Sequence, residues 1–253
     1  MCSRPGVTNV PAVRAPTPIH LRPAAALAER VLLPGDPHRA LAVAQDLLEK
    51  PLMFNHARGL WGYTGTAPDG VPLSVQSTGM GGPSAAIVIE ELIGLGARRL
   101  IRIGTCAALT TDLELGRLVA VGEVVASDGA SAALGAGLRL SPDAGLTRAL
   151  VEGGAPAVTA ASTDLFYDPR EDLAAQWRAA GVEVIEMEAA TLLALAARRE
   201  ASAAVLLAIS DVLVERSRRR IGSDALEQAG LELGRAGYAA LTASGEGPVA
   251  PPP

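Results

Sequence analysis

The sequence is poor in aromatic residues, in cysteine and in long apolar runs. Phe, Trp and Tyr together make up 3% of the 253 residues, so a hydrophobic core must consist mainly of Ala, Leu, Val and Ile. Two cysteines, Cys2 and Cys106, are too few for a disulfide framework and are typical of a reducing cytoplasm. The apolar stretch AAVLLAI at 203–209 is far shorter than the ~20 residues of a membrane span, and the N-terminal residues have no apolar core of a secretory signal. We therefore expect a cytoplasmic protein with no membrane partner.

A basic excess and the common cofactor motifs are also absent. The formal net charge of −5 argues against a nucleic-acid partner, and the basic cluster RSRRR at 216–220 is more typical of a solvated loop or helix edge. The sequence has no G-x-G-x-x-G after its first apolar run, no P-loop and no G-x-S-x-G. Its histidines have no zinc-type spacing. We expect neither a metal site nor a bound cofactor.

Short apolar runs alternate with stretches of helical spacing, which favours an α/β fold. The expected strands lie within residues 29–35, 71–79, 98–104, 116–127, 155–162, 182–186 and 202–210. The expected helices lie within residues 37–48, 83–97, 170–181, 188–200 and 223–244. We predict a single α/β domain over 18–244 with a mixed central β-sheet flanked by helices, preceded by a flexible extension (1–17) and followed by a disordered tail (245–253).

Polar and glycine residues follow several expected strands, where ligands bind in such sheets. In LPGDPHR, Gly35 permits close backbone approach and Arg39 falls one turn into a helix, which suits a phosphate. The alternative is that Asp36 caps the helix, Pro37 begins it and Arg39 is solvated. In RIGTCAAL, Arg102 lies late in an apolar strand, where a buried charge needs a partner.

Three further segments carry candidate site residues. Glu186 and Glu188 flank Met187 where a helix begins, so they either offset the helix dipole or hold a ligand. In STDLFYDP, Phe166 is either a core aromatic or a platform for a flat ring. In ISD, Asp211 ends a buried strand as a general acid, a cap or the partner of nearby arginines. Arginines, a carboxylate pair, an aromatic and an acid together suit a nucleoside plus phosphate, because two carboxylate oxygens match a ribose diol.

The sequence closely resembles the nucleoside phosphorylase-I family, in particular its hexameric purine nucleoside, methylthioadenosine and uridine phosphorylase branch. The resemblance runs from residue 18 to about residue 244 and is carried, in the family's order, by PGDPHR, NHARG, STGMGGPSAAIVIEEL, RIGTCAA, STDLFYDP, EMEAATLL and AISD. It implies a pentosyltransferase that cleaves a nucleoside with inorganic phosphate to free base and pentose 1-phosphate. It also implies a homo-oligomer, a dimer unit built up to a hexamer.

The resemblance assigns residues to three subsites. Phosphate would be held by Gly35, Arg39, Arg102 and Thr105, with Arg58 from a neighbouring subunit. Ribose would be held by Met187 and Glu188, with His20 from the neighbour. The base would be surrounded by Cys106, Ala107, Phe166, Ile185, Glu186 and Ser210. Asp211 would protonate or hydrogen-bond purine N7 as the glycosidic bond breaks.

Two features of the sequence bear on the substrate. Uridine enzymes carry an inserted Gln- and Arg-containing segment after the aromatic pair, whereas FYDPRED here runs directly into an expected helix, which favours purine nucleosides over uridine. The family has Gly-Ala where this chain has Ala107-Ala108, which places the pocket's shape and activity in question. The sequence leaves open whether one of the arginines within 216–220 helps Asp211 to donate its proton, and which one. The alternatives are a uridine phosphorylase, a nucleosidase, and a non-catalytic nucleoside-binding relative of the same fold.

Overall fold

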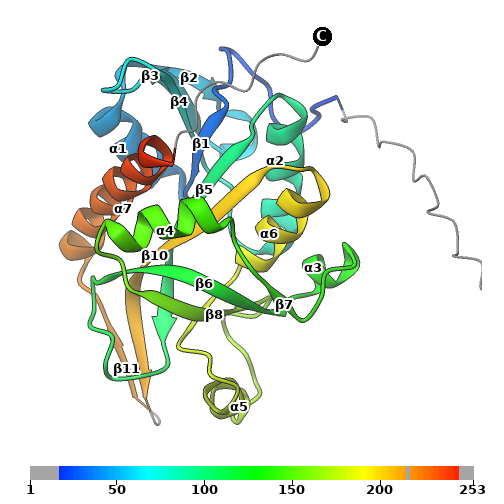
Figure 1. Ribbon diagram of the computed structural model, residues 1–253, viewed down its shortest axis with the longest axis vertical. Coiled ribbons are helices and arrows are strands. Elements are labelled where there is room, and N and C mark those ends of the chain that lie inside the picture. The colour runs from blue at the N-terminus through cyan, green and yellow to red at the C-terminus, as the bar shows by residue number, and fades with distance from the viewer. Residues whose placement is uncertain (1–16, 215–216, 245–253) are drawn as a thin grey trace, which may run out of the picture.

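Eleven strands and seven α-helices make up the described part of this computed structural model, residues 17–214 and 217–244 (Figure 1). The strands are β1 (Arg30–Leu33), β2 (Glu49–Asn55), β3 (Gly62–Thr66), β4 (Pro72–Gln76), β5 (Arg99–Ala108), β6 (Leu118–Ser127), β7 (Arg139–Leu140), β8 (Ala157–Thr163), β9 (Val184–Glu186), β10 (Ser202–Val214) and β11 (Ser217–Arg220). The helices are α1 (Pro37–Leu47), α2 (Gly82–Gly94), α3 (Gly129–Ala133), α4 (Ala144–Glu152), α5 (Leu173–Ala179), α6 (Ala189–Arg198) and α7 (Ser223–Ala243), and a 3-10 helix η1 spans Ala57–Gly59. Residues 1–16 of the expected extension and the expected tail, 245–253, lie outside the described residues.

The strands form one mixed sheet in the order β11-β10-β6-β8-β9-β5-β1-β4-β3-β2, with β7 on β6. β5 runs parallel to β1 and β10, whereas β2, β3 and β4 form an antiparallel meander. Because β10 pairs with both β5 and β6, and β9 with both β5 and β8, the strands β5, β10, β6, β8 and β9 close into a small barrel. The expected mixed sheet flanked by helices is confirmed.

Helices cover the sheet in two groups. α1, α4 and α7 pack together on one side, and α2, α3 and α6 on the other (Figure 1). α6 is apolar around most of its circumference, and every residue from 189 to 196 is buried. Burial of this kind contributes roughly 1.5–3 kcal/mol per large aliphatic side chain. The start of α6 is therefore held in place by packing, and this start carries the two glutamates.

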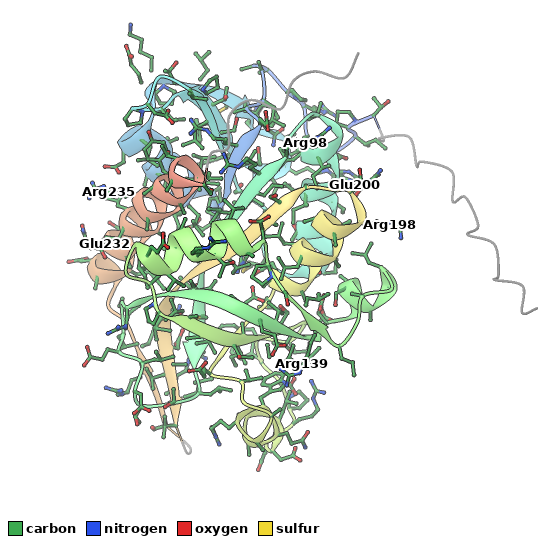
Figure 2. The ribbon with its side chains drawn as sticks, viewed as in Figure 1. Arg98, Arg139, Arg198, Glu200, Glu232 and Arg235 are labelled. Carbon is green, nitrogen blue, oxygen red and sulfur yellow. The ribbon has the colours of Figure 1, made fainter. Side chains whose placement is uncertain are left out.

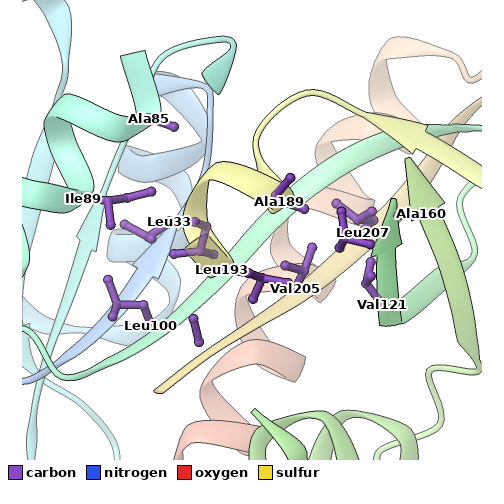
Figure 3. Packing of buried hydrophobic residues seen from close by; sticks show 14 of the residues in the cluster. Leu33, Ala85, Ile89, Leu100, Val121, Ala160, Ala189, Leu193, Val205 and Leu207 are labelled. Atoms are coloured by element: carbon purple, nitrogen blue, oxygen red, sulfur yellow. The ribbon is translucent and has the colours of Figure 1, made fainter. Parts of the chain in front are cut away.

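The core is aliphatic, as the scarcity of aromatic residues predicts. Figure 3 shows Ala85 and Ile89 of α2 and Leu193 of α6 packed near strand residues such as Leu100 and Val205. Many charged side chains lie at the periphery; Arg98, Arg139, Arg198, Glu200, Glu232 and Arg235 are all exposed (Figure 2). No helix in residues 17–214 and 217–244 is long and apolar enough to cross a membrane.

The structure differs from the expected elements in two ways that affect the site. β5 continues to Ala108, so Arg102 lies in the middle of a strand and not near its end. The described residues of the basic cluster form β11, because Ser217–Arg220 pair with the end of β10 in an antiparallel hairpin. The interpretation of this cluster as a loop or helix edge is wrong, although all four side chains are exposed.

Candidate functional site

A cavity of about 460 Å³ lies where β1, β5, β8, β9 and β10 approach their carboxyl ends. Every residue expected at the site lines it, except His20 and Arg58. The turn between β1 and α1 contributes Gly35, and α1 contributes Arg39. From β5 come Arg102, Thr105, Cys106 and Ala107, and from the β8–α5 loop Phe166. β9 and the start of α6 contribute Ile185, Glu186, Met187 and Glu188, and β10 contributes Ser210 and Asp211.

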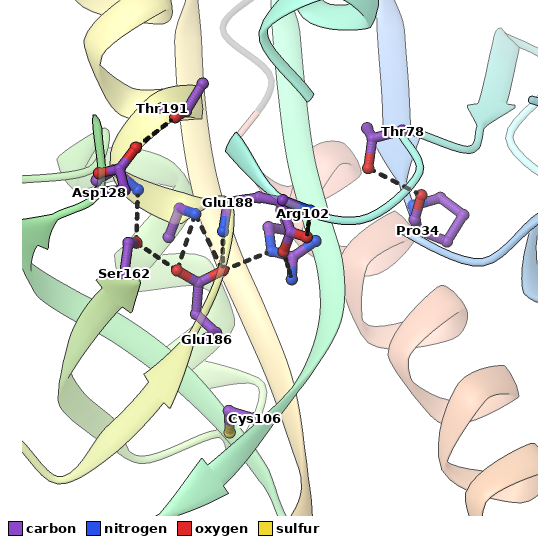
Figure 4. A network of polar contacts seen from close by, with 12 residues as sticks. Pro34, Thr78, Arg102, Cys106, Asp128, Ser162, Glu186, Glu188 and Thr191 are labelled. Atoms are coloured by element: carbon purple, nitrogen blue, oxygen red, sulfur yellow. Dashed lines mark hydrogen bonds and ion pairs between the residues drawn. The ribbon is translucent and has the colours of Figure 1, made fainter. Parts of the chain in front are cut away.

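Arg102 is a buried cation at the inner end of this cavity. It pairs in the sheet with Leu33, the last residue of β1, so its side chain lies where β1 ends. Its Nε donates to Glu186 Oε2 at 3.0 Å and its Nη2 contacts Glu188 Oε2 (Figure 4). Burial lowers the pKa of Arg102, but the carboxylates of Glu188 and Glu186 raise it and prevail. The expected partner for this buried charge is therefore present twice.

One nitrogen of Arg102 has no partner. Nη1 is buried and makes no hydrogen bond within residues 17–214 and 217–244. An unpaired buried donor costs about 1–3 kcal/mol, and more for a charged group. A guanidinium with two edges neutralised by carboxylates and a third donor left open is a site for an anionic oxygen.

Gly104 makes room for the Arg102 guanidinium. A Cβ on Gly104 would lie 2.7 Å from Arg102 Nη2 and 2.8 Å from its Cζ. The guanidinium therefore lies across the backbone of its own strand, two residues along. A glycine at this position lets Arg102 reach both glutamates.

Glu186 organises the start of α6. Its carboxylate accepts hydrogen bonds from the backbone N–H of Glu188 at 2.8 Å and of Ala189 at 2.9 and 3.0 Å, and from the hydroxyl of Ser162 (Figure 4). With Arg102 added, both oxygens are occupied and the side chain has 0% exposure. The geometry gives Glu186 a structural task at the start of α6, in line with the helix-dipole interpretation, and the base contact expected from the sequence stays a prediction.

Glu188 is differently placed. Its Oε1 accepts from the N–H of Gly81 at 2.5 Å, and its other oxygen contacts Arg102. It is the N-cap residue of α6, yet its side chain makes no capping hydrogen bond. Burial, followed by the charge of Glu186, raises the pKa of Glu188 even though Arg102 opposes this. The two carboxylates thus have different partners: Glu186 caps the start of α6, whereas Glu188 binds Gly81 and Arg102 at the border of the cavity.

A second arginine, Arg39, faces the same cavity from α1. Asp36 caps α1 by accepting from the N–H of His38 at 3.0 Å, and Pro37 is the first helical residue, so the capping interpretation is correct. Arg39 is nevertheless not a solvated surface residue. Burial lowers its pKa, and the nearby charge of Arg102 lowers it further although Asp36 opposes both. Within the described residues Arg39 forms no hydrogen bond or salt bridge, so the cavity holds two cations with donors to spare.

The last residues of β5 form part of the cavity wall. Thr105 and Ala107 are partly exposed and alternate with buried Cys106, as the period of a strand requires. Ala107 pairs with Ile185 of β9. Burial raises the pKa of the Cys106 thiol, which keeps it a neutral wall group and not a nucleophile.

Asp211 reaches the cavity through a β-bulge. The register of β10 against β5 shifts between Ile209 and Asp211, so Ser210 and Asp211 both line the cavity although neighbours in a regular strand point to opposite faces. Asp211 is buried, and the Ser210 hydroxyl lies 2.8 Å from its Oδ2. Ser210 Oγ also lies 3.1 Å from the carbonyl oxygen of Cys106.

The hairpin strand β11 supplies the partner of Asp211. Arg218 Nε donates to Asp211 Oδ1 at 2.7 Å, and Arg220 Nη1 lies 3.6 Å from the same oxygen. Side chains alternate along a strand, so Arg218 and Arg220 share the cavity face while Arg219 does not. The open question of which arginine accompanies Asp211 is thereby settled within the described residues.

Phe166 borders the outer part of the cavity. It is 51% exposed and packs edge-to-face with Tyr167, with ring centroids 4.9 Å apart. The guanidinium carbon of Arg218 lies 4.6 Å from the centroid of the Phe166 ring, a cation–π distance. Arg218 therefore joins the aromatic residue and the acid.

His20 and Arg58 do not line this cavity. Asn55 connects their segments, because its Oδ1 accepts from the N–H of Arg22 at 2.9 Å and of Ala57 at 3.3 Å. His20 Nδ1 lies 2.8 Å from Glu91 Oε1. Arg58 is exposed and has a left-handed backbone (φ 58°), an unfavourable conformation for a side chain of this size. That the two residues serve the site of a neighbouring subunit stays a prediction from the resemblance.

Several lining residues were not identified from the sequence. They are Met80, Gly104, Thr163, Leu165 and Leu213, besides Asp36, Pro37, Arg218 and Arg220, which the sequence indicated without a firm role. The alternation in Ser217–Arg220 was the available signal for the two arginines. Within residues 17–214 and 217–244, no cluster of three His, Cys, Asp or Glu side chains is arranged to hold a metal ion.

Comparison with known proteins identifies the family. The model of the phosphorylase superfamily matches residues 29–246. The chain is 40% identical over 197 residues to the purine nucleoside phosphorylase DeoD-type of Jannaschia sp., which covers 74% of this chain and 84% of that protein. It is 38% identical to the protein of the same name from Clostridium perfringens (74% and 83% covered) and 35% identical to that from Clostridium beijerinckii (78% and 86%). The chain therefore belongs to the phosphorylase superfamily, and the resemblance to nucleoside phosphorylases is confirmed.

Proposed function

We propose that this protein is a nucleoside phosphorylase, a pentosyltransferase that cleaves a purine nucleoside with inorganic phosphate to free base and pentose 1-phosphate. The observation that carries the proposal is the unpaired, buried Nη1 of Arg102, close to a second cation, Arg39, and beside the carboxylate of Glu188. An anion site and a carboxylate that border one cavity match the two substrates. The names of the relatives support the purine nucleoside as the class.

Phosphate is bound by the cations at the inner end of the cavity. Arg102 and Arg39 donate to its oxygens, Thr105 offers a hydroxyl, and Gly35 lets the backbone approach. Gly35 has little space to spare, because a Cβ there would lie 3.2 Å from the carbonyl oxygen of Gly79. Arg58 from a neighbouring subunit completes the site, which would explain why it is exposed and strained in its own chain.

The ribose lies next to the phosphate. Glu188 accepts hydrogen bonds from the sugar hydroxyls, and the partly exposed side chain of Met187 packs against the ring. His20 from the neighbouring subunit binds the 5′ end. The proposal therefore requires at least a dimer with shared sites, and we expect such dimers to assemble into a hexamer.

The reaction breaks the bond between C1′ and N9. A phosphate oxygen attacks C1′ as this bond lengthens, the electron pair moves to N9, and positive charge develops on the ribose ring. Asp211, in its protonated form, transfers a proton to N7, so the base leaves as a neutral molecule. The guanidinium of Arg218, 2.7 Å away in the structure, stabilises the carboxylate that remains.

Ala107 is compatible with this pocket. It is partly exposed in the cavity wall and adds one methyl group beside Ile185, where it narrows the pocket without filling it. The apolar residues around it suit a flat base. No metal or organic cofactor takes part in the proposed chemistry, and we expect the reaction to take place in the cytoplasm.

The experiment is base release from inosine, adenosine, 5′-methylthioadenosine and uridine, each with and without inorganic phosphate. Release from purine nucleosides that requires phosphate supports the proposal. Release without phosphate identifies a nucleosidase, preferential release from uridine identifies a uridine phosphorylase, and binding without release identifies a non-catalytic relative; each result refutes the proposal.

A further inference from the structure

We propose that Arg218 makes the base subsite selective for 6-oxopurine nucleosides, such as inosine and guanosine, over 6-aminopurine nucleosides. This inference rests on the proposed phosphorolysis and concerns the same cavity. It follows from the donors that the hairpin strand β11 places beside Asp211.

The guanidinium of Arg218 is held on two sides and open on the third. Nε is taken by Asp211 Oδ1 at 2.7 Å, and the Phe166 ring holds the guanidinium carbon at 4.6 Å from its centroid. Neither Nη atom makes a hydrogen bond within residues 17–214 and 217–244. Because Arg218 lines the cavity, these N–H groups are available to a bound base next to Asp211.

The edge of the purine that carries N7 differs between the two classes of base. A 6-oxopurine presents two acceptors there, N7 and O6, whereas adenine presents the acceptor N7 and the donor N6–H₂. Asp211 in its protonated form offers one donor, to N7, and an Nη of Arg218 offers the second, to O6. An amino group would face the guanidinium donor to donor and leave it unpaired.

The same contact acts on the leaving group. As the glycosidic bond breaks, negative charge spreads over the purine onto O6, and a cation that donates to O6 stabilises this charge. The position of Arg218 relative to Asp211 is fixed locally, because the two residues are seven apart in one hairpin and the Ser210 hydroxyl contacts the other oxygen of the Asp211 carboxylate. The discrimination therefore needs no movement of a distant segment.

The test compares kcat/KM for inosine, adenosine and purine riboside, which has only hydrogen at C6, at saturating phosphate. Loss of one charged hydrogen bond corresponds to a factor of about 10–100. The wild-type protein should prefer inosine to adenosine by about this factor, with purine riboside between them. Arg218→Met should remove most of this preference, and Arg218→Lys, which keeps a positive charge, should retain part of it.

Arg219→Met is the matched control, because Arg219 lies on the same strand but on the opposite face and contacts neither Asp211 nor Phe166. It should leave the ratio unchanged. A ratio that is equal in the wild type and Arg218→Met, or a wild type that prefers adenosine, overturns the inference while leaving phosphorolysis intact. Absence of phosphate-dependent release from every nucleoside would overturn the proposed function itself. A ratio also separates selectivity from misfolding, since a merely destabilised hairpin would slow both substrates alike.

Discussion

Replacing Gly104 with Ala should disable the phosphate site by displacing Arg102, although Gly104 is assigned no phosphate contact of its own. The added Cβ would lie 2.7 Å from Arg102 Nη2, 2.8 Å from its Cζ and 3.1 Å from Leu207 Cδ2. Flexible side-chain ends relieve such contacts easily, but this guanidinium is anchored by Glu186 and Glu188. It must therefore move by several tenths of an ångström or give up a carboxylate.

The expected loss of stability follows from these two responses, displacement of the Arg102 guanidinium or loss of one of its carboxylate partners. Overpacking a strand costs about 1–3 kcal/mol, and loss of one partner from a buried ion pair costs about 3–5 kcal/mol. We expect the free energy of unfolding of Gly104→Ala to fall by about 2–4 kcal/mol. Displacement of Arg102 should also raise the KM for phosphate by a factor of about 10–100, the value of one charged hydrogen bond.

The assay is a phosphate titration of the initial rate together with urea unfolding. Gly122→Ala is the control, because Gly122 is also a strand glycine and a Cβ there would make only ordinary contacts, at 3.7 Å from Ala157 Cβ and 3.9 Å from the carbonyl oxygen of Val158. This variant should differ from wild type by less than about 1 kcal/mol. If both variants have the same phosphate KM and the same stability, the reasoning about Arg102 is wrong.

Three other perturbations test separate parts of the structure. Asp211→Asn should spare phosphate binding, measured by calorimetry, but reduce kcat by a factor of about 10²–10⁴; an unchanged kcat with every purine nucleoside would exclude proton transfer from this residue. Glu188→Ala should weaken nucleoside binding more than binding of the free base, and equal losses for both ligands would make the residue structural. Because burial raises the pKa of Glu188 above 4.5, the nucleoside affinity of the wild type should fall as the pH drops through that raised value. Asp69→Asn should cost about 1 kcal/mol of stability at pH 7, because the hydrogen bonds with Arg30 lower the pKa of Asp69 to about 2. This contribution is complete above pH 3.8 and is lost as the pH falls through about 2. The stability of the variant should therefore depend less on pH in that range than that of the wild type, and parallel pH curves would contradict the assignment.

Elements with a strong apolar period were predictable from the sequence. The strands β1, β4, β5, β6, β8, β9 and β10 and the helices α1, α2, α5, α6 and α7 all lie within or overlap the expected ranges. β2 was missed because the edge strand EKPLMFN is largely exposed and has no apolar alternation. β3 was missed because GYTGT is short and contains two glycines, which are unfavourable in strands. α4 carried a usable signal that was overlooked: Leu146 and Leu150 are four residues apart, between a capping Asp143 and Gly153.

Most of the residues that line the cavity were also predictable from the sequence. Several expected strand ends carried polar residues and glycine, and parallel strands bring their carboxyl ends together. The division of labour between Glu186 and Glu188 was not available. Both carboxylates look alike in a sequence, and both contact Arg102 in the structure. Only the direction of the chain at the start of α6 turns Glu186 toward the N–H groups of its own helix and Glu188 toward Gly81.

The sequence by itself therefore determined the α/β class, the aliphatic core and the set of residues that meet at one edge of the sheet, because these depend on local periodicity and on the order of elements. Tertiary structure alone decided that four exposed residues, Ser217–Arg220, form a strand, since β11 has no preference of its own and exists through its pairing with β10. It also decided which nitrogen of Arg102 stays open and which arginine meets Asp211. Those contacts join residues distant in the chain or turned by a bulge, and their geometry depends on packing that no local pattern encodes.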